Sequence, residues 1–499
     1  MGDLRDLFRL LGAGLILARR DALLPREYEP LYPPPLRLLG RLLRTALAAR
    51  ATGRPGERLA GALERLGPVA IKMGQLLSTR SDIIGAQMAQ DLARLKDRLA
   101  PFSTETARRL VEAELGKSLD ALFSRFDPPV AAASLAQAHP AELADGRKVA
   151  VKVLRPGVEQ RVARDARVLR MGAGLVEKLA PAARRLEPRA FAETVIRATQ
   201  LELDLRLEAA GADELREIMA RDDYMRAPAV VWEGVGKRVL TLEWAQGMSL
   251  TDTRALEQPG IDRKALADRL IRAFLSQALD HGVFHADLHE GNLFVAAPAR
   301  LTAVDFGIVG RLGTKERRYL AEILYGFLER DYARIAQIHF DAGYVPRDQS
   351  VAAFAQALRA VGEPVFGRAA SQVAMSRLLT QLFDITALFD MRLRPELVLL
   401  QKTMMTVEGV ARSIYPDHDM WAAADPVVRR WITRELSPAS RLQRLGEDAH
   451  ALMRRLNDRL EAQPQTILTV QSARPAGLAW FALGAVTSGL AFLAAAILF

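Results

Sequence analysis

The 499-residue chain contains no cysteine. Disulfides, thiolate catalysis and cysteine-ligated zinc or iron–sulfur clusters are therefore excluded. Aromatic residues are sparse, at 6% of the chain, and no module for reading nucleic acid is evident, so we expect no nucleic-acid partner. No G-x-G-x-x-G pattern follows a strand, which argues against a dinucleotide-binding unit.

The composition is that of a folded, mainly helical protein with an excess of positive charge. Half of the residues are apolar and 26% are charged, which excludes wholesale disorder. Leucine, alanine and arginine are far commoner than valine, isoleucine and tyrosine, so helix should outweigh strand. The formal net charge of +10 favours contact with the phosphates of a nucleotide or of anionic lipids. An arginine-rich proteome would explain the same charge, and this alternative stays open.

Residues 1–55 form a basic amphipathic N-terminal region. Leu4, Leu7, Phe8 and Leu11 recur at helical spacing with arginines between them, which indicates a helix that is apolar along one side. Its apolar run is too short to span a bilayer. A cleaved signal peptide is the alternative, but acidic residues near the start of the chain oppose it.

The middle of the chain changes from helical to β-rich patterns. Residues 56–126 are expected to be helical throughout, with one helix starting at a capping position near Ser103. Residues 127–246 are the β-rich segment, although long helical patterns occupy its centre, at 157–220. Its expected strands and turns are a strand and loop at 130–143, a hairpin turn at Asp145-Gly146, and strands at 148–154, 227–232 and 238–244.

Residues 247–415 are mostly helical, with strand patterns at 293–295 and 301–304, and a helical tail is expected at 416–475. The predicted fold is therefore α+β, with a small β-rich lobe followed by a larger helical lobe. The last segment, 476–499, carries no charge and would be about 36 Å long as a helix, enough to cross a bilayer. We expect a transmembrane helix there, with the main body on the cytoplasmic side; a buried core helix is the alternative.

Lys152 is a lone lysine on the apolar strand 148–154. This pattern resembles the V-A-I-K strand of kinases, whose lysine reaches the α- and β-phosphates of ATP. A solvent-facing lysine on an edge strand would look the same. Glu208, on a helical pattern farther along the chain, is the candidate acidic partner of this lysine.

The segment that contains Glu208 carries two more acidic residues. Asp204 and Glu208 are four residues apart and are expected to share a helix face, where like charges call for a nearby cation. Glu202 should lie on a different face, so that two lysines could approach this helix from two sides. Alternatively, Glu202 pairs with Arg206 in solvent.

The strongest pattern is the stretch from His285 to Asn292, followed by Asp305-Phe-Gly. Asp287 and Asn292 have the D-x-x-x-x-N spacing of a kinase catalytic loop. Asn292 and Asp305 supply the oxygen ligands that magnesium prefers when it bridges phosphates. A zinc site made of His285, Asp287 and His289 is the alternative, but it would leave Asn292 and Asp305 unexplained.

Three further motifs resemble those of the UbiB family of atypical kinases, over about residues 60 to 410. Lys72-Met-Gly-Gln75 matches the K-x-G-Q signature of that family. Ala131–Ser134 resembles the alanine-rich loop that replaces the kinase glycine-rich loop, and alanines there would make a phosphate loop stiffer. Glu202-Leu-Asp204 matches its E-x-D motif. The resemblance implies a protein-kinase-like two-lobe fold with a helical N-terminal extension.

The resemblance also implies that Lys72 contacts Glu202, while Lys152 pairs with Glu208 and the nucleotide. The sequence patterns and the resemblance together assign the candidate site residues. For catalysis they are Asp287, Lys72 and Gln75, and for ATP binding they are Ala131, Ala132, Ala133, Ser134, Lys152, Glu208 and Glu243. For regulation they are Glu202 and Asp204, and for magnesium they are Asn292 and Asp305. ATP and Mg²⁺ are the expected cofactors. Departures from the family pattern occur at Ala138, Gly211, Leu288 and Glu290, none of which removes a phosphate or metal contact.

By resemblance, the expected function is a membrane-associated kinase-like ATPase that supports ubiquinone biosynthesis at the bacterial inner membrane. No Ala-Pro-Glu follows Asp305-Phe-Gly, which argues against ordinary protein phosphorylation. The implied partners are anionic lipids, isoprenoid phenol or quinone precursors, and other quinone-biosynthesis enzymes. Small residues four apart in 476–499 leave a homodimer open. A nucleotide-binding pseudokinase scaffold is the alternative, and a 2-polyprenylphenol hydroxylase component is a third.

Overall fold

The computed structural model describes residues 2–31, 34–47, 51–78, 84–92, 95, 100–179, 187–366, 385, 388–389, 391 and 395–435. Residues 1–434 form one compact unit and residues 435–499 a second. The predicted transmembrane helix at 476–499, like most of the tail at 416–475, lies outside the described residues. Among the helices that are described, none is both long enough and apolar enough to cross a membrane.

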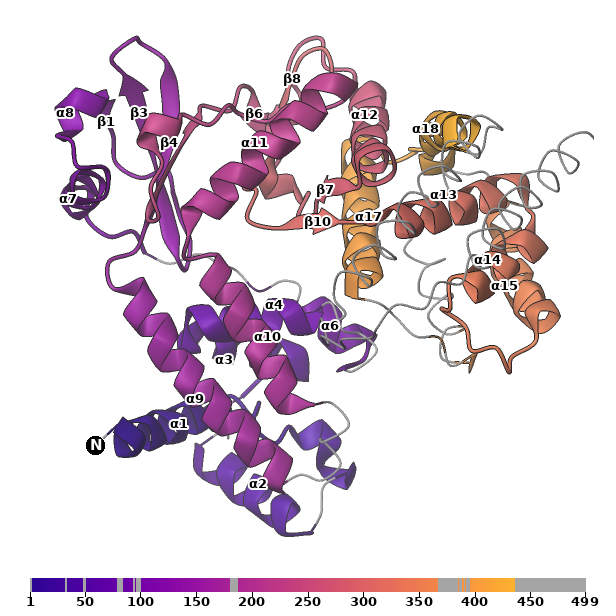
Figure 1. Cartoon of the computed structure of the whole chain (residues 1–499). Helices are drawn as coiled ribbons and strands as arrows, with labels where there is room; N and C mark the ends of the chain where they lie inside the picture. The colour runs from indigo at the N-terminus through magenta and orange to yellow at the C-terminus, as the bar shows by residue number, and fades with distance from the viewer. Residues whose placement is uncertain are drawn as a thin grey trace, which may run out of the picture. The chain divides into compact units, whose positions relative to one another are not determined.

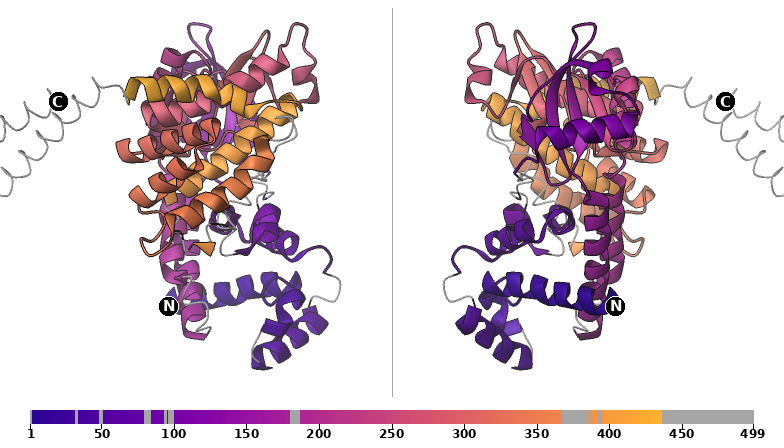
Figure 2. Two further views of the ribbon diagram at one scale, coloured as in Figure 1. Left: turned by 90° about the vertical axis from the view of Figure 1, so that its right-hand side faces the viewer. Right: turned by 90° about the vertical axis from the view of Figure 1, so that its left-hand side faces the viewer.

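Helices make up the N-terminal part of the chain, as the sequence predicts. They are α1 (Gly2–Arg19), the short 3₁₀ helix η1 (Arg26–Leu31), α2 (Pro34–Leu47), α3 (Pro55–Leu66), α4 (Pro68–Ser78) and α6 (Ala86–Leu92). Both views of Figure 2 show α1 and α2, in indigo, next to one another, and the two helices are in contact. Helices α3, α4 and α6 share a small apolar core in which Leu63 and Leu92 are buried. This core holds the K-x-G-Q helix, α4, in place.

A five-stranded antiparallel sheet follows (Figure 1). Its strands are β1 (Phe123–Phe126), β2 (Ala131–Ala132), β3 (Ala136–Leu143), β4 (Lys148–Leu154) and β5 (Val239–Glu243). The order is β1-β3-β4-β5, and β2 pairs with β3. Helices α7 (Thr104–Leu115) and α8 (Leu119–Leu122) precede the sheet. Val149, Val151 and Val153 of β4 pack with α7 in a common core, so alternation along β4 leaves Lys152 on the opposite face.

Two expectations for this region were wrong. Residues 123–126 form strand β1 instead of continuing the predicted helical segment, because their backbone pairs with β3. Residues 227–232 do not form a strand. Val230 in this segment forms only an isolated bridge with Leu242 of β5, and Arg226, just before the segment, bridges Thr302 of β9 instead.

The helices between β4 and β5 are α9 (Val158–Leu179), α10 (Pro188–Leu201) and α11 (Leu205–Asp222). The expectation that Asp204 and Glu208 share a helix face was wrong, because the helix breaks between α10 and α11. Asp204 is the N-cap of α11: its carboxylate accepts a hydrogen bond from the Arg206 amide and forms an ion pair with the Arg206 guanidinium. Glu202 lies before the break and pairs with Lys72, whereas Glu208 lies within α11 and pairs with Lys152.

The C-terminal part is mainly helical, as predicted. Its helices are α12 (Arg263–Ser276), α13 (Thr314–Glu329), α14 (Tyr332–Asp341), α15 (Val351–Phe366), α17 (Pro395–Ile414) and α18 (Met420–Glu435), with the short helical turns η4 (Thr253–Leu256), η5 (Gln277–His281) and η6 (Glu290–Asn292). A further short turn, η3 (Trp232–Gly234), lies before β5. The predicted strands are β8 (Leu293–Ala296) and β9 (Arg300–Ala303). The pattern missed three strands of two or three residues: β6 (Met248–Ser249), β7 (Val283–His285) and β10 (Val309–Arg311). Such short strands carry too little alternation to be read from sequence.

His339 is buried in α14, where its ring packs against Tyr344 and Phe354 and its Nδ1–H donates to the Ile335 carbonyl. Burial lowers the pKa of His339 to about 4. In the unfolded chain the histidine has its ordinary pKa of about 6.5. As the pH falls from 6.5 to 4, the unfolded state therefore binds a proton at this residue that the folded state does not bind. The stabilising contribution of the neutral ring is complete above this window and is lost within it.

We expect protonation of His339 to lower the free energy of unfolding by about 2 kcal/mol when the pH is lowered from 7.5 to 5. Urea unfolding at the two pH values measures the change. His339→Gln should flatten the pH dependence, whereas His289→Gln, at an exposed histidine, should not. Equal slopes for wild type and His339→Gln would contradict the prediction.

Candidate active site

Lys152 lies between two carboxylates at the centre of the candidate site. Its Nζ is 2.8 and 2.9 Å from the carboxylate oxygens of Glu208 on α11, and 3.4 Å from Oδ1 of Asp305, in the loop that follows β9. Burial opposes the charge on Lys152, but the carboxylates of Asp305 and Glu208 outweigh it and raise the pKa of the amine. Lys152 in turn holds the pKa of Asp305 below its usual range. The predicted pairing of Lys152 with Glu208 is confirmed, and the alternative of a solvent-facing lysine is wrong.

The alanine-rich loop lies on the same face of the sheet as Lys152. Ala131 of β2 is paired with Ala138 of β3, which is paired with Lys152 of β4. Cross-strand partners point to the same side of a sheet, and neighbouring strands are about 4.8 Å apart. The backbone of Ala131 therefore lies about 10 Å from that of Lys152, across two strand spacings.

Hydrogen bonds hold the remainder of this loop in place. The Ala133 amide donates to the Ala136 carbonyl, and Nε of Arg155 donates to the Ala133 carbonyl at 2.8 Å. Ser134 is buried. Arg155 was not predicted to take part, although it directly follows strand β4 and its Nη1 also donates to the Ala100 carbonyl.

The segment from His285 to Asn292 starts at the last residue of β7 and ends in the turn η6, and the π-helical turn η5 lies directly before β7. The His285 amide donates to Oε1 of Gln277 in that turn, and Nε2–H of His285 donates to the Val304 carbonyl. Nδ1 of the same ring accepts a hydrogen bond from the Asp287 amide. Burial lowers the pKa of His285, which keeps the ring in this neutral form. His285 therefore supports the backbone of Asp287, while the Asp287 side chain stays about one-third exposed.

This hydrogen bonding contradicts the zinc alternative. Both ring nitrogens of His285 are occupied by the backbone, so the ring has no lone pair for a metal. Among the described residues, no group of three or more histidine, aspartate or glutamate side chains is arranged to hold a metal ion.

Asp305 and Asn292 offer oxygen ligands of the kind that magnesium prefers. The Asn292 side-chain nitrogen donates to the Asp287 carbonyl, which leaves its amide oxygen available. Asp305 adopts a left-handed conformation, with φ 61°, and Phe306 beside it is buried against the ring of His285. This donor set fits a magnesium ion that is also held by phosphate oxygens.

Gly211, one of the departures from the family pattern, has a steric explanation here. A Cβ at this position would lie 3.1 Å from a methyl group of Val309 and 3.6 Å from the Phe306 carbonyl. Helix α11 therefore packs closely against the segment that follows Asp305. This close packing helps to position Glu208 relative to Asp305.

The second predicted ion pair is also present. Nζ of Lys72, on α4, donates to Oε1 of Glu202 at the end of α10. Burial raises the pKa of Glu202, and the neighbouring ammonium of Lys72 opposes this shift. The alternative pairing of Glu202 with Arg206 is wrong, because Arg206 pairs with Asp204. The K-x-G-Q helix is thus attached to the acidic turn that precedes α11.

Gln75 and Glu243, two more of the predicted site residues, take no part in the ion pairs of Lys152 and Lys72. Gln75 lies on α4, one turn after Lys72, and no hydrogen bond of its side chain to another predicted site residue occurs within the described part of the chain. Glu243 is the last residue of β5, where its backbone amide donates to the Ala229 carbonyl and its carboxylate faces the Ala229 amide at 3.4 Å. It lies at the point where the chain leaves the five-stranded sheet.

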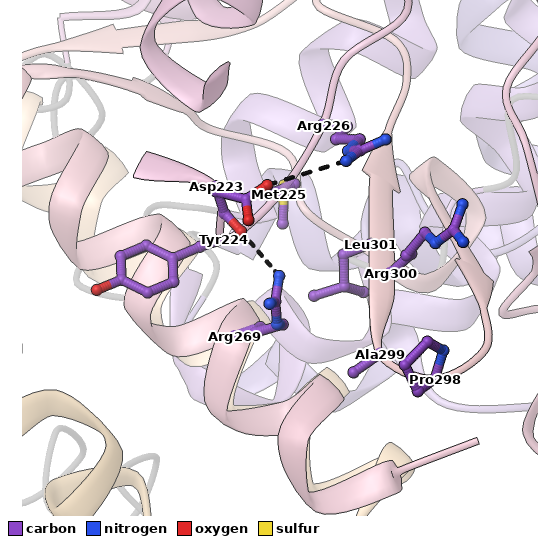
Figure 3. Close-up of a pocket in the computed structure, with 9 residues that line it drawn as sticks. All are labelled: Asp223, Tyr224, Met225, Arg226, Arg269, Pro298, Ala299, Arg300 and Leu301. Atoms are coloured by element: carbon purple, nitrogen blue, oxygen red, sulfur yellow. Dashed lines mark hydrogen bonds and ion pairs between the residues drawn. The ribbon is translucent and has the colours of Figure 1, made fainter. Parts of the chain in front are cut away.

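A pocket of about 200 Å³ lies elsewhere, between the loop after α11, helix α12 and the turn between β8 and β9 (Figure 3). Its lining contains none of the predicted site residues. Arg269 reaches toward the backbone of Asp223, to which its Nη1 donates a hydrogen bond. Arg226 and Arg300 are exposed at its edge. This pocket therefore does not belong to the Lys152 cluster.

Comparisons with known proteins agree with the motif assignment. The ABC1 atypical kinase-like domain matches residues 94–339, and the UbiB helical domain matches residues 358–419. The structure of Rv3197 from Mycobacterium tuberculosis, solved with erythromycin, superimposes with a TM-score of 0.52 at 22% sequence identity, over 79% of this chain and 98% of that one. This likeness supports the kinase-like fold.

Several curated relatives are similar over most of their length. "Probable protein kinase UbiB" of Marinobacter nauticus is 37% identical over 95% of this chain and 87% of the relative. The proteins of the same name from Xylella fastidiosa (strain M12) and Azotobacter vinelandii are 40% and 39% identical, over 80% and 84% of this chain and 73% and 79% of the relatives. This chain therefore belongs to the UbiB family and carries an ABC1 atypical kinase-like domain.

Proposed function

We propose that this protein binds Mg-ATP and hydrolyses it, or transfers its terminal phosphate to a small molecule or lipid, in support of ubiquinone biosynthesis. The observation that carries the proposal is the placement of Lys152 against both Glu208 and Asp305. A lysine held in this way can meet the α- and β-phosphates, while Asp305 and Asn292 hold magnesium.

In the proposed hydrolysis, a water oxygen forms a bond to the γ-phosphorus as the bond to the bridging oxygen of ADP breaks. Asp287 accepts the proton of the attacking water, and the products are ADP and phosphate. Magnesium would neutralise the charge that develops on the phosphate oxygens. The ion pair of Lys72 with Glu202 keeps α4 at the acidic turn, where it would limit access by a large protein acceptor.

The surface of the N-terminal helices supports the proposal of membrane association. The apolar side of α1 faces outward instead of entering a core: Leu4, Phe8 and Leu11 are each more than 60% exposed. The opposite side of this helix attaches to α9 through the ion pair of Asp6 with Arg167. An apolar face with exposed arginines near it suits an anionic lipid surface.

Helix α2 extends this apolar surface. Leu38 and Leu42 are 62% and 58% exposed, and α2 is in contact with α1. The exposed Arg41 on the same helix forms an ion pair with Glu29. We propose that α1 and α2 lie in the headgroup region of the cytoplasmic leaflet of the inner membrane, and that 476–499 crosses it.

The variant Leu11→Glu/Leu42→Glu should bind vesicles that contain phosphatidylglycerol at least about 10-fold more weakly, since each leucine would bury apolar area worth about 1.5 kcal/mol or more. Co-sedimentation of residues 1–435, which include the first compact unit, measures this without the C-terminal segment. Trp232→Glu, at a half-exposed residue of η3, is the matched control. Unchanged binding of the double variant would exclude α1 and α2 as the contact surface.

Phosphate release by the purified full chain tests the catalytic proposal. We expect slow turnover of Mg-ATP that rises on addition of anionic vesicles or of phenolic lipid precursors. Binding of Mg-ATP without phosphate release under any of these conditions would instead favour the scaffold function. Absence of Mg-ATP binding would overturn both. Quinone-biosynthesis enzymes as partners, and a homodimer, are parts of the proposal that co-purification and light scattering can test.

A further inference from the structure

Helix α17 lies directly against the catalytic loop, although it belongs to the region that matches the UbiB helical domain. The buried hydroxyl of Thr403 donates to the carbonyl of Ala286 at 3.1 Å. Toward the other end of the helix, the hydroxyl of Ser413 donates to the carboxylate of Glu290 at 2.7 Å. These two contacts are about 15 Å apart along the helix axis and flank Asp287.

Lys402 precedes Thr403 and is partly buried at this interface. Burial lowers the pKa of its amine, while the carboxylate of Asp287 raises it and the ammonium of Lys72 lowers it further. The amine of Lys402 therefore lies within electrostatic range of Asp287 and Lys72. Within the described residues, no hydrogen bond or ion pair to this amine is found. A partly buried ammonium without a direct partner is unfavourable unless an anion joins it.

The catalytic loop itself supplies no cation. His-Ala-Asp-Leu-His-Glu-Gly-Asn, residues 285–292, contains neither lysine nor arginine, and Ala286 stands where the H-R-D signature of kinases has arginine. Transfer of a phosphoryl group needs positive charge near its oxygens. Lys152 forms ion pairs with Glu208 and Asp305, and Lys72 forms one with Glu202. In the described part of the chain, the amine of Lys402 forms no ion pair.

We infer that Lys402 binds the γ-phosphate of ATP beside Asp287, and so supplies from helix α17 the positive charge that the catalytic loop lacks. The inference rests on the proposed function, because it requires that ATP occupies the Lys152 site. It assigns the UbiB helical domain a direct contact with the nucleotide. The affinity for ADP, which has no γ-phosphate, should not depend on this lysine.

The test compares Lys402→Met, which keeps the length of the side chain but removes the charge, with wild-type full chain. Isothermal titration with Mg-AMPPNP and Mg-ADP should show about 10-fold weaker binding of AMPPNP, with ADP affinity changed by less than about 2-fold. Phosphate release should fall about 100-fold, and Lys402→Arg should recover most of the AMPPNP affinity. Lys315→Met, at an exposed lysine of α13, should change none of these values.

Two results would overturn the inference while the proposed function stands. Equal losses of AMPPNP and ADP affinity would show that Lys402 only supports the fold. Unchanged AMPPNP affinity would show that Lys402 does not contact the nucleotide. Thermal melting of each variant separates misfolding from a lost contact, because a variant that has lost only the contact melts as a folded protein. Lys402→Arg, which keeps the positive charge, should fold. If wild-type protein binds neither nucleotide, the proposed function itself fails and the inference fails with it.

Discussion

Replacing Asp305 by asparagine is expected to lower the rate of phosphate release by at least about 100-fold. The substitution keeps the size of the side chain but removes the charge that would hold magnesium on the phosphates. It also removes one of the two carboxylates that raise the pKa of Lys152. Colorimetric phosphate release at saturating Mg-ATP measures the effect.

Asp341→Asn, at an exposed aspartate that accepts a hydrogen bond from Gln337, is the matched control and should retain the wild-type rate. Raising the magnesium concentration should recover part of the activity of Asp305→Asn, because the remaining ligands bind the ion more weakly. A rate for Asp305→Asn within about 3-fold of wild type would mean that no phosphoryl transfer occurs at this cluster.

Replacing Lys152 by methionine is expected to weaken Mg-ATP binding by at least about 30-fold, or about 2 kcal/mol, the usual contribution of a charge-assisted contact. The same change should lower the free energy of unfolding by about 2 kcal/mol, because it leaves the buried carboxylate of Glu208 without its cation and close to the like charge of Asp305. The side chain of Glu208 is 9% exposed and that of Lys152 28% exposed, so solvent replaces only part of the lost interaction. Nucleotide titration and urea unfolding measure the two effects.

The double variant Lys152→Met/Glu208→Gln separates structure from binding. Removing the charge of Glu208 as well should recover about 1 kcal/mol of the lost stability, since the uncompensated carboxylate is gone. It should not recover Mg-ATP affinity, because no amine remains to meet the phosphates. Recovery of both quantities together would show that Lys152 acts on the nucleotide only through the stability of the fold.

Local sequence features predicted much of the candidate site, and the reasons are visible at particular residues. The apolar alternation around Lys152 and the turn at Asp145-Gly146 specify strands β3 and β4 by themselves, since turn chemistry and periodicity act over a few residues. The spacing from Asp287 to Asn292 predicted the segment that we propose as the catalytic loop. Motif resemblance supplied the pairing of Lys72 with Glu202, which lie 130 residues apart and share no local pattern.

The errors arose where long-range contacts overrule local preference. Strand β1 exists because Phe123 and Phe126 pack into the core beside α7, and the segment 227–232 loses its strand because Arg226 pairs with β9. The break at Asp204 was missed because Glu202–Glu208 looks like a continuous helix. A capping aspartate before an apolar run was the available signal.

The sequence by itself determined the chemical parts of this protein: the strand lysine, the acidic loop residues, the K-x-G-Q helix and an N-terminal helix that is apolar on one side. Tertiary structure alone decided several arrangements that no local pattern or motif predicted. It ended α10 at Leu201 and began α11 at Leu205, put helix α17, which carries Lys402, against the 285–292 segment, and turned the leucines of α1 outward. The physical reason is that ion pairing and burial depend on distances between segments far apart in the chain, and the packing of the whole unit determines those distances.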